Sequence, residues 1–290
     1  MSKRILILGA GGMLGHDCFN YFNSLEGFET FGTWRKEDQD RIKSFDANND
    51  SVKELISELN PDWIINCIGV IKQKIDESDQ LSVENTFRIN QDFPHEIARV
   101  VAKTRTKVIQ IATDCVFSGE VGSYSEESKH DAYDLYGKSK SRGEIDSEEF
   151  VNLRVSIIGR EIETKYSLVD WFLAHDHGAL VNGYENHLWN GITTIAFSRI
   201  AAGIIQSEYQ VSGTIHIVPS SQVNKYELLN LLSKHFDRGD IRIKPINTPC
   251  KVDRTLSTLY PELNQSIWKN AGYKEIPSIE ELIAELADNS

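Results

Sequence analysis

The stretch ILILGAGGMLGHDCF, residues 5–19, decides how the rest of the chain is interpreted. An apolar run leads into a loop with glycines at 9, 12 and 15, and a helical pattern starts at residue 13. Glycine lets backbone approach a pyrophosphate and lets helix pack on strand, while the helix N-terminus offers N–H donors. We therefore expect a dinucleotide site, with a plain tight turn as the alternative. Its contacts are predicted to be Gly9, Gly12, Met13, Leu14 and Gly15.

The spacing of these glycines is G-x-x-G-x-x-G. The commoner dinucleotide spacing would place glycine at 9, 11 and 14, and residue 14 is Leu. The strand–turn–helix context nevertheless fits a cofactor loop.

Short apolar runs alternate with amphipathic stretches along the first half of the chain. Strands are expected at 4–8, 29–34, 62–68, 107–113 and 150–156, and helices at 13–24, 51–59, 82–104 and 135–147. Because such runs suit strands buried on both faces, this order predicts an α/β fold with a Rossmann-type doubly wound parallel sheet.

After residue 157 the alternation loosens, and a smaller mixed α/β substrate-binding lobe is expected there. Residues 1–157 and 191–218 are assigned to an NAD(P)-binding Rossmann domain. Residues 158–190 and 219–290 are assigned to the substrate-binding lobe, which is thus built from two separated segments.

The composition is that of an ordinary globular protein, with 40% hydrophobic and 26% charged residues. A net charge of −12 argues against nucleic acid or an anionic membrane surface as partner. Four widely spaced cysteines suggest reduced thiols, and no apolar run is long enough for a signal peptide or a membrane span. We expect a cytoplasmic protein. The residues around His175 match no metal-ligand spacing, so no metal is expected.

The second predicted strand ends in GTWRKED, which indicates the cofactor type. An NAD site usually has an acidic residue here for the ribose hydroxyls. This chain has Thr33, Arg35 and Lys36, which suit a 2′-phosphate. NADPH is therefore the expected cofactor, with NADH left open; the alternative is a solvated Arg–Lys pair.

The segment DLYGKSKSRGE, residues 134–144, contains the candidate reacting pair. Tyr136 and Lys140 are four apart, so both lie on one face of a helix. A hydride added to a ketone leaves an alkoxide, to which Tyr136 would give a proton if its pKa fell from about 10 toward neutrality. The Lys140 ammonium and the positive charge of the nicotinamide are together expected to lower that pKa, and Thr113 is expected to hold the carbonyl oxygen.

The glycine loop, Thr113, Tyr136-x-x-x-Lys140 and the βα order resemble the extended short-chain dehydrogenases/reductases. TDCVFSG, NCIG and LYGKSKSRGE are more particularly similar to the dTDP-4-dehydrorhamnose reductase-like branch of nucleotide-sugar reductases. The resemblance implies reduction of the 4-keto group of a nucleoside diphosphate-linked 6-deoxy sugar, in sugar-nucleotide biosynthesis for surface polysaccharide. It also allows a homodimer. The implied cofactor contacts, beyond the glycine loop and Lys140, are Asp46, Ala47, Cys67, Ile68 and Gly69.

The chain departs from that branch where the sugar should bind. Those enzymes have Tyr where this chain has Cys115, and Trp where it has Ile157. The class of substrate is kept, but dTDP-4-dehydrorhamnose itself is put in doubt. The expected substrate contacts are Asp114, Cys115, Trp189, Asn190 and Arg254; for the last three, a loop anchor or a surface ion pair is the alternative.

Three other functions are compatible with this fold. A 4,6-dehydratase needs a Glu after the Thr-Asp pair, and Cys115 stands there. An epimerase would use Tyr136 and Lys140 equally well, so it stays open. A non-catalytic NADP-binding regulatory subunit would have no chemical reason to keep Thr113, Tyr136 and Lys140 together.

Overall fold

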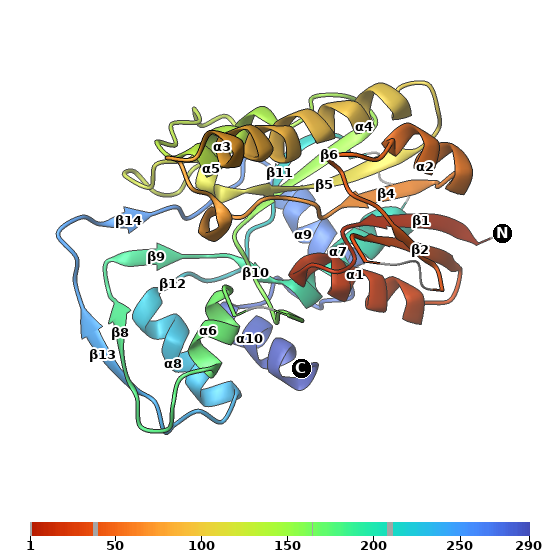
Figure 1. The fold of residues 1–290 in the computed structure, drawn as a ribbon. Coiled ribbons are helices and arrows are strands. Elements are labelled where there is room, and N and C mark those ends of the chain that lie inside the picture. Colours follow the sequence, from red (N-terminus) through yellow and green to blue (C-terminus); the bar gives the residue numbers. More distant parts are fainter. Residues whose placement is uncertain (1, 37–39, 164, 208–210) are drawn as a thin grey trace.

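The first strand, β1 (Lys3–Leu8), lies inside a parallel sheet with helices on both faces (Figure 1). Its side chains alternate: Ile5 and Ile7 enter one hydrophobic cluster, and Leu6 and Leu8 enter another. A strand covered on both faces must be apolar throughout, as this one is. The predicted α/β fold with a Rossmann-type sheet is confirmed.

The computed structural model describes residues 2–36, 40–163, 165–207 and 211–290. Within these residues a seven-stranded sheet has the order β11-β6-β5-β4-β1-β2-β3, and all its pairs are parallel. The other strands of the sheet are β2 (Phe28–Trp34), β3 (Ile42–Ser44), β4 (Trp63–Asn66), β5 (Lys107–Thr113), β6 (Phe150–Val155) and β11 (Gly213–His216). The order reverses between β1 and β4, and ligands of such sheets bind at the carboxyl ends beside that reversal.

The helices cover the two faces of the sheet (Figure 1). One face carries α2 (Val52–Leu59), α3 (Gln80–Phe87), α4 (Phe93–Val101) and α5 (Leu135–Arg142). The other carries α1 (Met13–Ser24), α7 (Thr194–Gln206) and α9 (Pro261–Asn270). Each layer contributes to its own apolar cluster, so the sheet is held from both sides.

A smaller part with its own hydrophobic cluster lies beside the sheet (Figure 1). It contains α6 (Leu168–Leu173), β8 (Leu180–Tyr184), β9 (His187–Trp189), β12 (Val223–Asn224), α8 (Lys225–His235), β13 (Arg242–Ile246), β14 (Val252–Asp253) and α10 (Ile279–Asp288). β13 pairs with β8, while β12, β9 and β14 form a three-stranded sheet. Two short strands, β7 (Ile157–Ile158) and β10 (Ile192–Thr193), pair with each other. The division into two domains stays a proposal, which this separate cluster supports.

The expected helix 82–104 is interrupted in the structure by a π-helical turn, η2 (Arg88–Asp92), between α3 and α4. Pro94 has no N–H to give to the carbonyl of Asn90, four residues earlier, so the α-helical ladder breaks there. The Phe93 N–H donates instead to the Arg88 carbonyl, five residues back.

Two other boundaries differ from expectation. Helix α5 ends at Arg142, not at 147, because the next residue packs directly on the π-helical turn. A Cβ on Gly143 would lie 1.9 Å from the Asn90 carbonyl oxygen. The short edge strand β3 was not predicted, since its three residues are too few to show a period.

The junction of β1 and α1 yields a stability prediction. Gly9 has a φ of 86°, and a Cβ on Gly15 would lie 2.1 Å from the Gly9 carbonyl oxygen. Gly15→Ala should therefore lower the free energy of unfolding by about 1–3 kcal/mol through overpacking. Gly12→Ala is the matched control, because its Cβ would lie 3.5 Å from the same oxygen. Denaturant unfolding of both variants measures the difference; an equal loss in the two would contradict the account.

Candidate functional site

The glycine loop is fastened to the end of β2. The Gly9 N–H donates to Thr33 Oγ1 at 2.9 Å, and the Ala10 N–H donates to the Thr33 carbonyl at 2.8 Å. Gly12 is the N-cap of α1 and has no capping side chain among the described residues. The first N–H groups of α1, from the half-buried Met13 and the buried Leu14 onward, are thus left for an anionic ligand.

The loop after β2 carries the two cations expected for a 2′-phosphate. Arg35 is exposed. The Lys36 ammonium lies 4.5 Å from the centre of the Trp34 ring and forms an ion pair with Glu163. Trp34 itself lies against Gly11, where a Cβ would be 2.2 Å from the indole nitrogen. Arg35 is therefore the better placed of the two to meet a ligand.

Asp46 and Ala47 follow β3. The Asp46 carboxylate accepts hydrogen bonds from the Asn48 N–H at 3.0 Å and the Asn49 amide at 3.1 Å. The Ala47 carbonyl accepts one from Arg88 at 2.7 Å. Local turn contacts thus hold this segment, and its role at the adenine stays a prediction.

The turn at residues 67–69 lies against the glycine loop. A Cβ on Gly9 would be 2.9 Å from Ile68 Cγ1, and Gly69 is exposed. A hydrogen bond with Cys18, together with burial, raises the pKa of the Cys67 thiol. Cys67 is therefore a neutral wall residue of the predicted cofactor cleft.

Asn90, in the π-helical turn, is a residue that sequence reasoning missed. Its side-chain amide accepts from the Val70 N–H at 2.8 Å and donates to the Val70 carbonyl at 3.0 Å. It also donates to Ser139 Oγ in α5 at 3.1 Å. The break at Pro94 was the one signal in the sequence that could have pointed to this turn. Asn90 joins the 67–70 segment to the helix that carries the reacting pair.

The three predicted catalytic residues meet at the end of β5. Thr113 is the last residue of the strand; its hydroxyl donates to Asp114 Oδ1 at 3.3 Å and lies near enough to the Tyr136 phenol to influence its pKa. Lys140 is buried in α5, and its Nζ donates to the Ile111 carbonyl at 2.9 Å. The spacing of four places Tyr136 and Lys140 on one helix face against the strand end, as expected.

The pKa of Tyr136 differs from expectation. Burial raises the pKa of the phenol, and Cys115 and Asp114 act in the same direction. Burial also lowers the pKa of Lys140 to about 8. The expected fall toward neutrality is thus wrong for the protein alone, because Lys140 bonds the Ile111 carbonyl and the phenol is desolvated. Tyr136 is a protonated phenol at neutral pH.

Asp114 and Cys115 continue from Thr113 into a short 3₁₀ turn. Burial raises the pKa of the Asp114 carboxyl, while the charges of Arg254 and Lys225 oppose this. Burial raises the pKa of the Cys115 thiol to about 12. Cys115 therefore stays protonated and cannot replace a catalytic Glu.

Trp189 and Asn190 are structural anchors in this arrangement. Trp189 is 5% exposed, and its Nε1 donates to Ser156 Oγ at 2.8 Å. The Asn190 amide donates to the Leu256 carbonyl at 2.7 Å and accepts from the Leu256 N–H at 2.9 Å. The structure does not favour the expected sugar contacts of these two residues. The Trp189 ring is buried, and both the oxygen and the nitrogen of the Asn190 amide already form hydrogen bonds.

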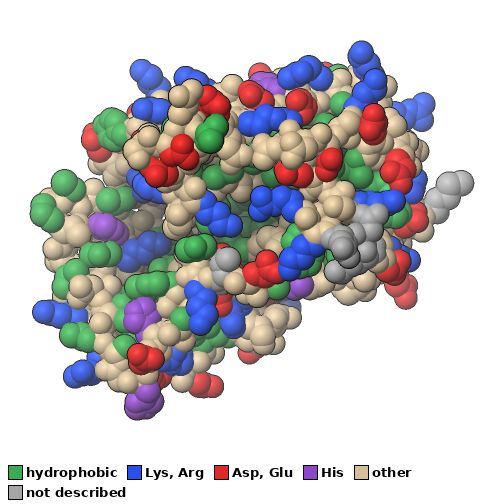
Figure 2. All heavy atoms as spheres, in the orientation of Figure 1, with side chains coloured by type: hydrophobic (Ala, Val, Ile, Leu, Met, Phe, Trp, Pro, Cys, Tyr) green, Lys and Arg blue, Asp and Glu red, His purple; other side chains and the backbone are tan. Residues whose placement is uncertain are grey.

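Arg254 follows β14 and packs on the segment after β5, where a Cβ on Gly119 would lie 3.0 Å from its Cγ. Its Nε donates to the Phe117 carbonyl at 2.9 Å. Lys225, the first residue of α8, was not predicted, because a lysine at a helix start carries no distinctive signal. Figure 2 shows Lys and Arg side chains along the band that separates the larger part of the molecule from the smaller one. Local positive charge thus exists in a chain of net charge −12.

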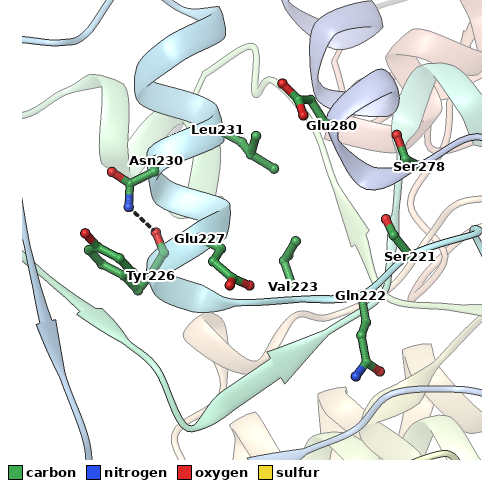
Figure 3. Close-up of a pocket in the computed structure, with 9 residues that line it drawn as sticks. All are labelled: Ser221, Gln222, Val223, Tyr226, Glu227, Asn230, Leu231, Ser278 and Glu280. Carbon is green, nitrogen blue, oxygen red and sulfur yellow. Dashed lines mark hydrogen bonds between the residues drawn. The ribbon is translucent and has the colours of Figure 1, made fainter.

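Other features of the described residues do not add to this site. They contain no cluster of three metal-ligating side chains and no helix with the length and apolar character to cross a membrane. A groove of about 550 Å³ lies between α8 and the start of α10 (Figure 3). Its lining residues, among them Tyr226, Glu227 and Glu280, include none of the predicted site residues.

Comparison with solved structures shows similar folds at low identity. A dTDP-4-dehydrorhamnose reductase from Bacillus anthracis, solved in complex with NADP, has a TM-score of 0.78 and 18% identity, with all of both chains covered. A UDP-glucuronic acid 4-epimerase from Bacillus cereus, solved with UDP-glucuronic acid and NAD, has a TM-score of 0.73 and 14% identity, with 98% of each chain covered.

Comparison with curated proteins gives a different kind of relative. The methionine adenosyltransferase 2 subunit beta of Xenopus tropicalis is 25% identical over 282 residues, covering 93% of this chain and 83% of that protein.

The family comparison covers nearly the whole chain. The model described as RmlD substrate binding domain matches residues 3–290. With the glycine loop, Thr113, Tyr136 and Lys140 assembled at one sheet edge, this confirms the resemblance seen in the sequence. The chain belongs to the RmlD substrate binding domain family, on the fold of the extended short-chain dehydrogenases/reductases.

Proposed function

We propose that the protein is an NADPH-dependent reductase of the 4-keto group of a nucleoside diphosphate-linked 6-deoxy sugar. The observation that carries this is the convergence of Thr113, Tyr136 and Lys140 at the carboxyl edge of the sheet, the same edge at which the glycine loop follows β1. A second observation supports it: the cleft beside Asp114 holds cations that suit a diphosphate.

The chain's own residues would handle the proton and the carbonyl oxygen. The Thr113 hydroxyl and the Tyr136 phenol lie near each other and would hold a carbonyl oxygen between them. Tyr136, protonated at neutral pH, would then give its proton to the alkoxide. Lys140, a buried ammonium below pH about 8, would stabilise the phenolate left behind.

The residues present fit a dinucleotide. The uncapped start of α1 offers N–H groups to a pyrophosphate, and the exposed Arg35 offers a cation to a 2′-phosphate. NADPH, when bound, supplies the hydride. NADH stays open as a second cofactor, since Lys36 is already paired with Glu163.

Two alternatives have support of their own. The likeness to a UDP-glucuronic acid 4-epimerase keeps epimerisation open, because Tyr136 and Lys140 would serve it equally. The likeness to a methionine adenosyltransferase subunit beta supports a regulatory subunit. The presence of Thr113, Tyr136 and Lys140 together argues against a regulatory subunit, because such a subunit would need to bind the cofactor but would not need catalytic residues.

Substitution of the phenol tests the reductase directly. Tyr136→Phe keeps the ring and removes the proton donor, so turnover with NADPH and a 4-keto sugar nucleotide should fall about 10²–10⁴-fold. Cofactor affinity, measured by fluorescence titration, should stay within about twofold, since free energy changes below about 0.5 kcal/mol are typical where no contact is lost. Tyr133→Phe is a control on the exposed segment before α5. Retained turnover in Tyr136→Phe would refute the assigned role.

The cofactor preference is tested at Arg35. Loss of a charge-assisted contact to a 2′-phosphate should weaken NADPH binding by about 1.5–3 kcal/mol in Arg35→Ala, and NADH binding should not change. Titration of both cofactors against the wild type and the variant measures this. Equal affinities of the wild type for NADPH and NADH would rule out the assignment.

Lys140 predicts a pH dependence. Its pKa is lowered to about 8, so the ammonium is present below that pH and is lost above it. Tyr136, with its raised pKa, keeps its proton over the same range. The kcat for reduction should therefore be level near pH 7 and fall about tenfold per pH unit well above pH 8. A profile at saturating substrate that rises through pH 8 to 10 would contradict this.

A further inference from the structure

The three-stranded sheet β12-β9-β14 places basic and aromatic side chains on one face. β12 is antiparallel to β9, with Asn224 opposite Leu188, so the next residue, Lys225, comes opposite His187. β14 is parallel to β9, with Asp253 opposite Leu188, so the next residue, Arg254, comes opposite Trp189. Residues directly opposite share a face, and residues two apart on a strand do so too. His187 and Trp189 share one face of β9, and Lys225 and Arg254 directly follow the paired residues of β12 and β14; we call these four residues the basic face.

Side-chain contacts agree with this register. The Lys225 ammonium lies 5.3 Å from the centre of the Trp189 ring. His187 Nε2 forms a hydrogen bond with Thr248 Oγ1 at 2.8 Å. Burial lowers the pKa of His187, and the charges of Lys225 and Arg254 lower it further. The three basic side chains are therefore close enough to interact electrostatically, and the lowered pKa keeps His187 neutral at pH 7.

The basic face is turned toward the end of β5. The positive charges of Arg254 and Lys225 act on the Asp114 carboxyl, and Asp114 in turn acts on the Lys225 ammonium. Lys225 thus lies near the end of β5, close to Asp114.

Neither cation has an ion-pair partner among the described residues. Two carboxylates lie near enough to be influenced, Asp114 by both cations and Asp134 by Arg254, but neither carboxylate forms an ion pair with them. Burial penalises the Lys225 ammonium enough to lower its pKa to about 8. A partly desolvated cation without an ion-pair partner raises the free energy of the protein. An anionic ligand that pairs with it would offset this desolvation penalty.

We propose that Lys225 and Arg254 together bind the diphosphate of the substrate, one from each side of β9, with Lys225 a substrate-binding residue of this chain. This rests on the proposed function, since it takes the ligand to be a nucleoside diphosphate-linked sugar. The Trp189 ring lies against the Lys225 ammonium. It is not a stacking surface for the sugar, because it is buried and its Nε1 donates a hydrogen bond to Ser156.

Binding of pyrophosphate, UDP and dTDP, measured by calorimetry, tests the proposal without requiring turnover. Lys225→Met keeps the length of the side chain and removes the charge, and it should weaken all three about ten- to hundredfold. Lys225→Arg should restore most of the affinity. Lys234→Met, in the exposed part of the same helix, is the control and should change nothing. NADPH affinity should be the same in all variants.

A double-mutant cycle with Arg254→Met should show coupling, because both charges would contact one ligand. Unchanged binding of pyrophosphate and both nucleotides in a folded Lys225→Met protein would overturn the proposal, even if reduction of a keto sugar were observed. If binding depends on Lys225 but the protein reduces no keto sugar, the diphosphate site at Lys225 and Arg254 is supported and the reductase function is refuted.

Discussion

The contact between the π-helical turn and α5 is the constraint on which the reacting geometry depends. The carbonyl of Asn90 has no N–H from Pro94, and Gly143 packs on that oxygen at a distance that excludes any Cβ. The Asn90 side chain also forms hydrogen bonds with the Val70 backbone and the Ser139 hydroxyl. One residue thus sets the position of α5 relative to the turn at 67–70, and Tyr136 and Lys140 are carried with the helix.

Burial then gives the reacting groups their electrostatic character. Tyr136 and Lys140 are shifted in opposite directions, because desolvation favours the neutral form of each. The result is a phenol that keeps its proton and an ammonium close to its titration point. At neutral pH the phenol therefore carries a proton that an alkoxide could take.

Much of the fold could be predicted from the sequence, because buried parallel strands leave apolar runs such as residues 107–113 and glycine loops leave a spacing. The reacting residues followed from the Tyr136–Lys140 spacing on a helix. What escaped prediction depends on tertiary contacts: the role of Asn90, the desolvation of Tyr136, and the use of Trp189 and Asn190 as anchors. Lys225 escaped too, since only the pairing of β12 with β9 and the packing near β5 bring it close to His187 and Asp114.

Transfer of an isotopic label tests the central claim, that this chain is a working reductase, most directly. The protein would be incubated with NADPH deuterated at C4 of the nicotinamide and with 4-keto-6-deoxy sugars linked to dTDP and to UDP. Mass spectrometry and NMR of the products would locate the label. The account predicts one deuterium at C4 of the sugar, with one NADPH oxidised for each sugar reduced. Absence of label from every sugar, with the cofactor bound but not consumed, would contradict it and favour the regulatory subunit.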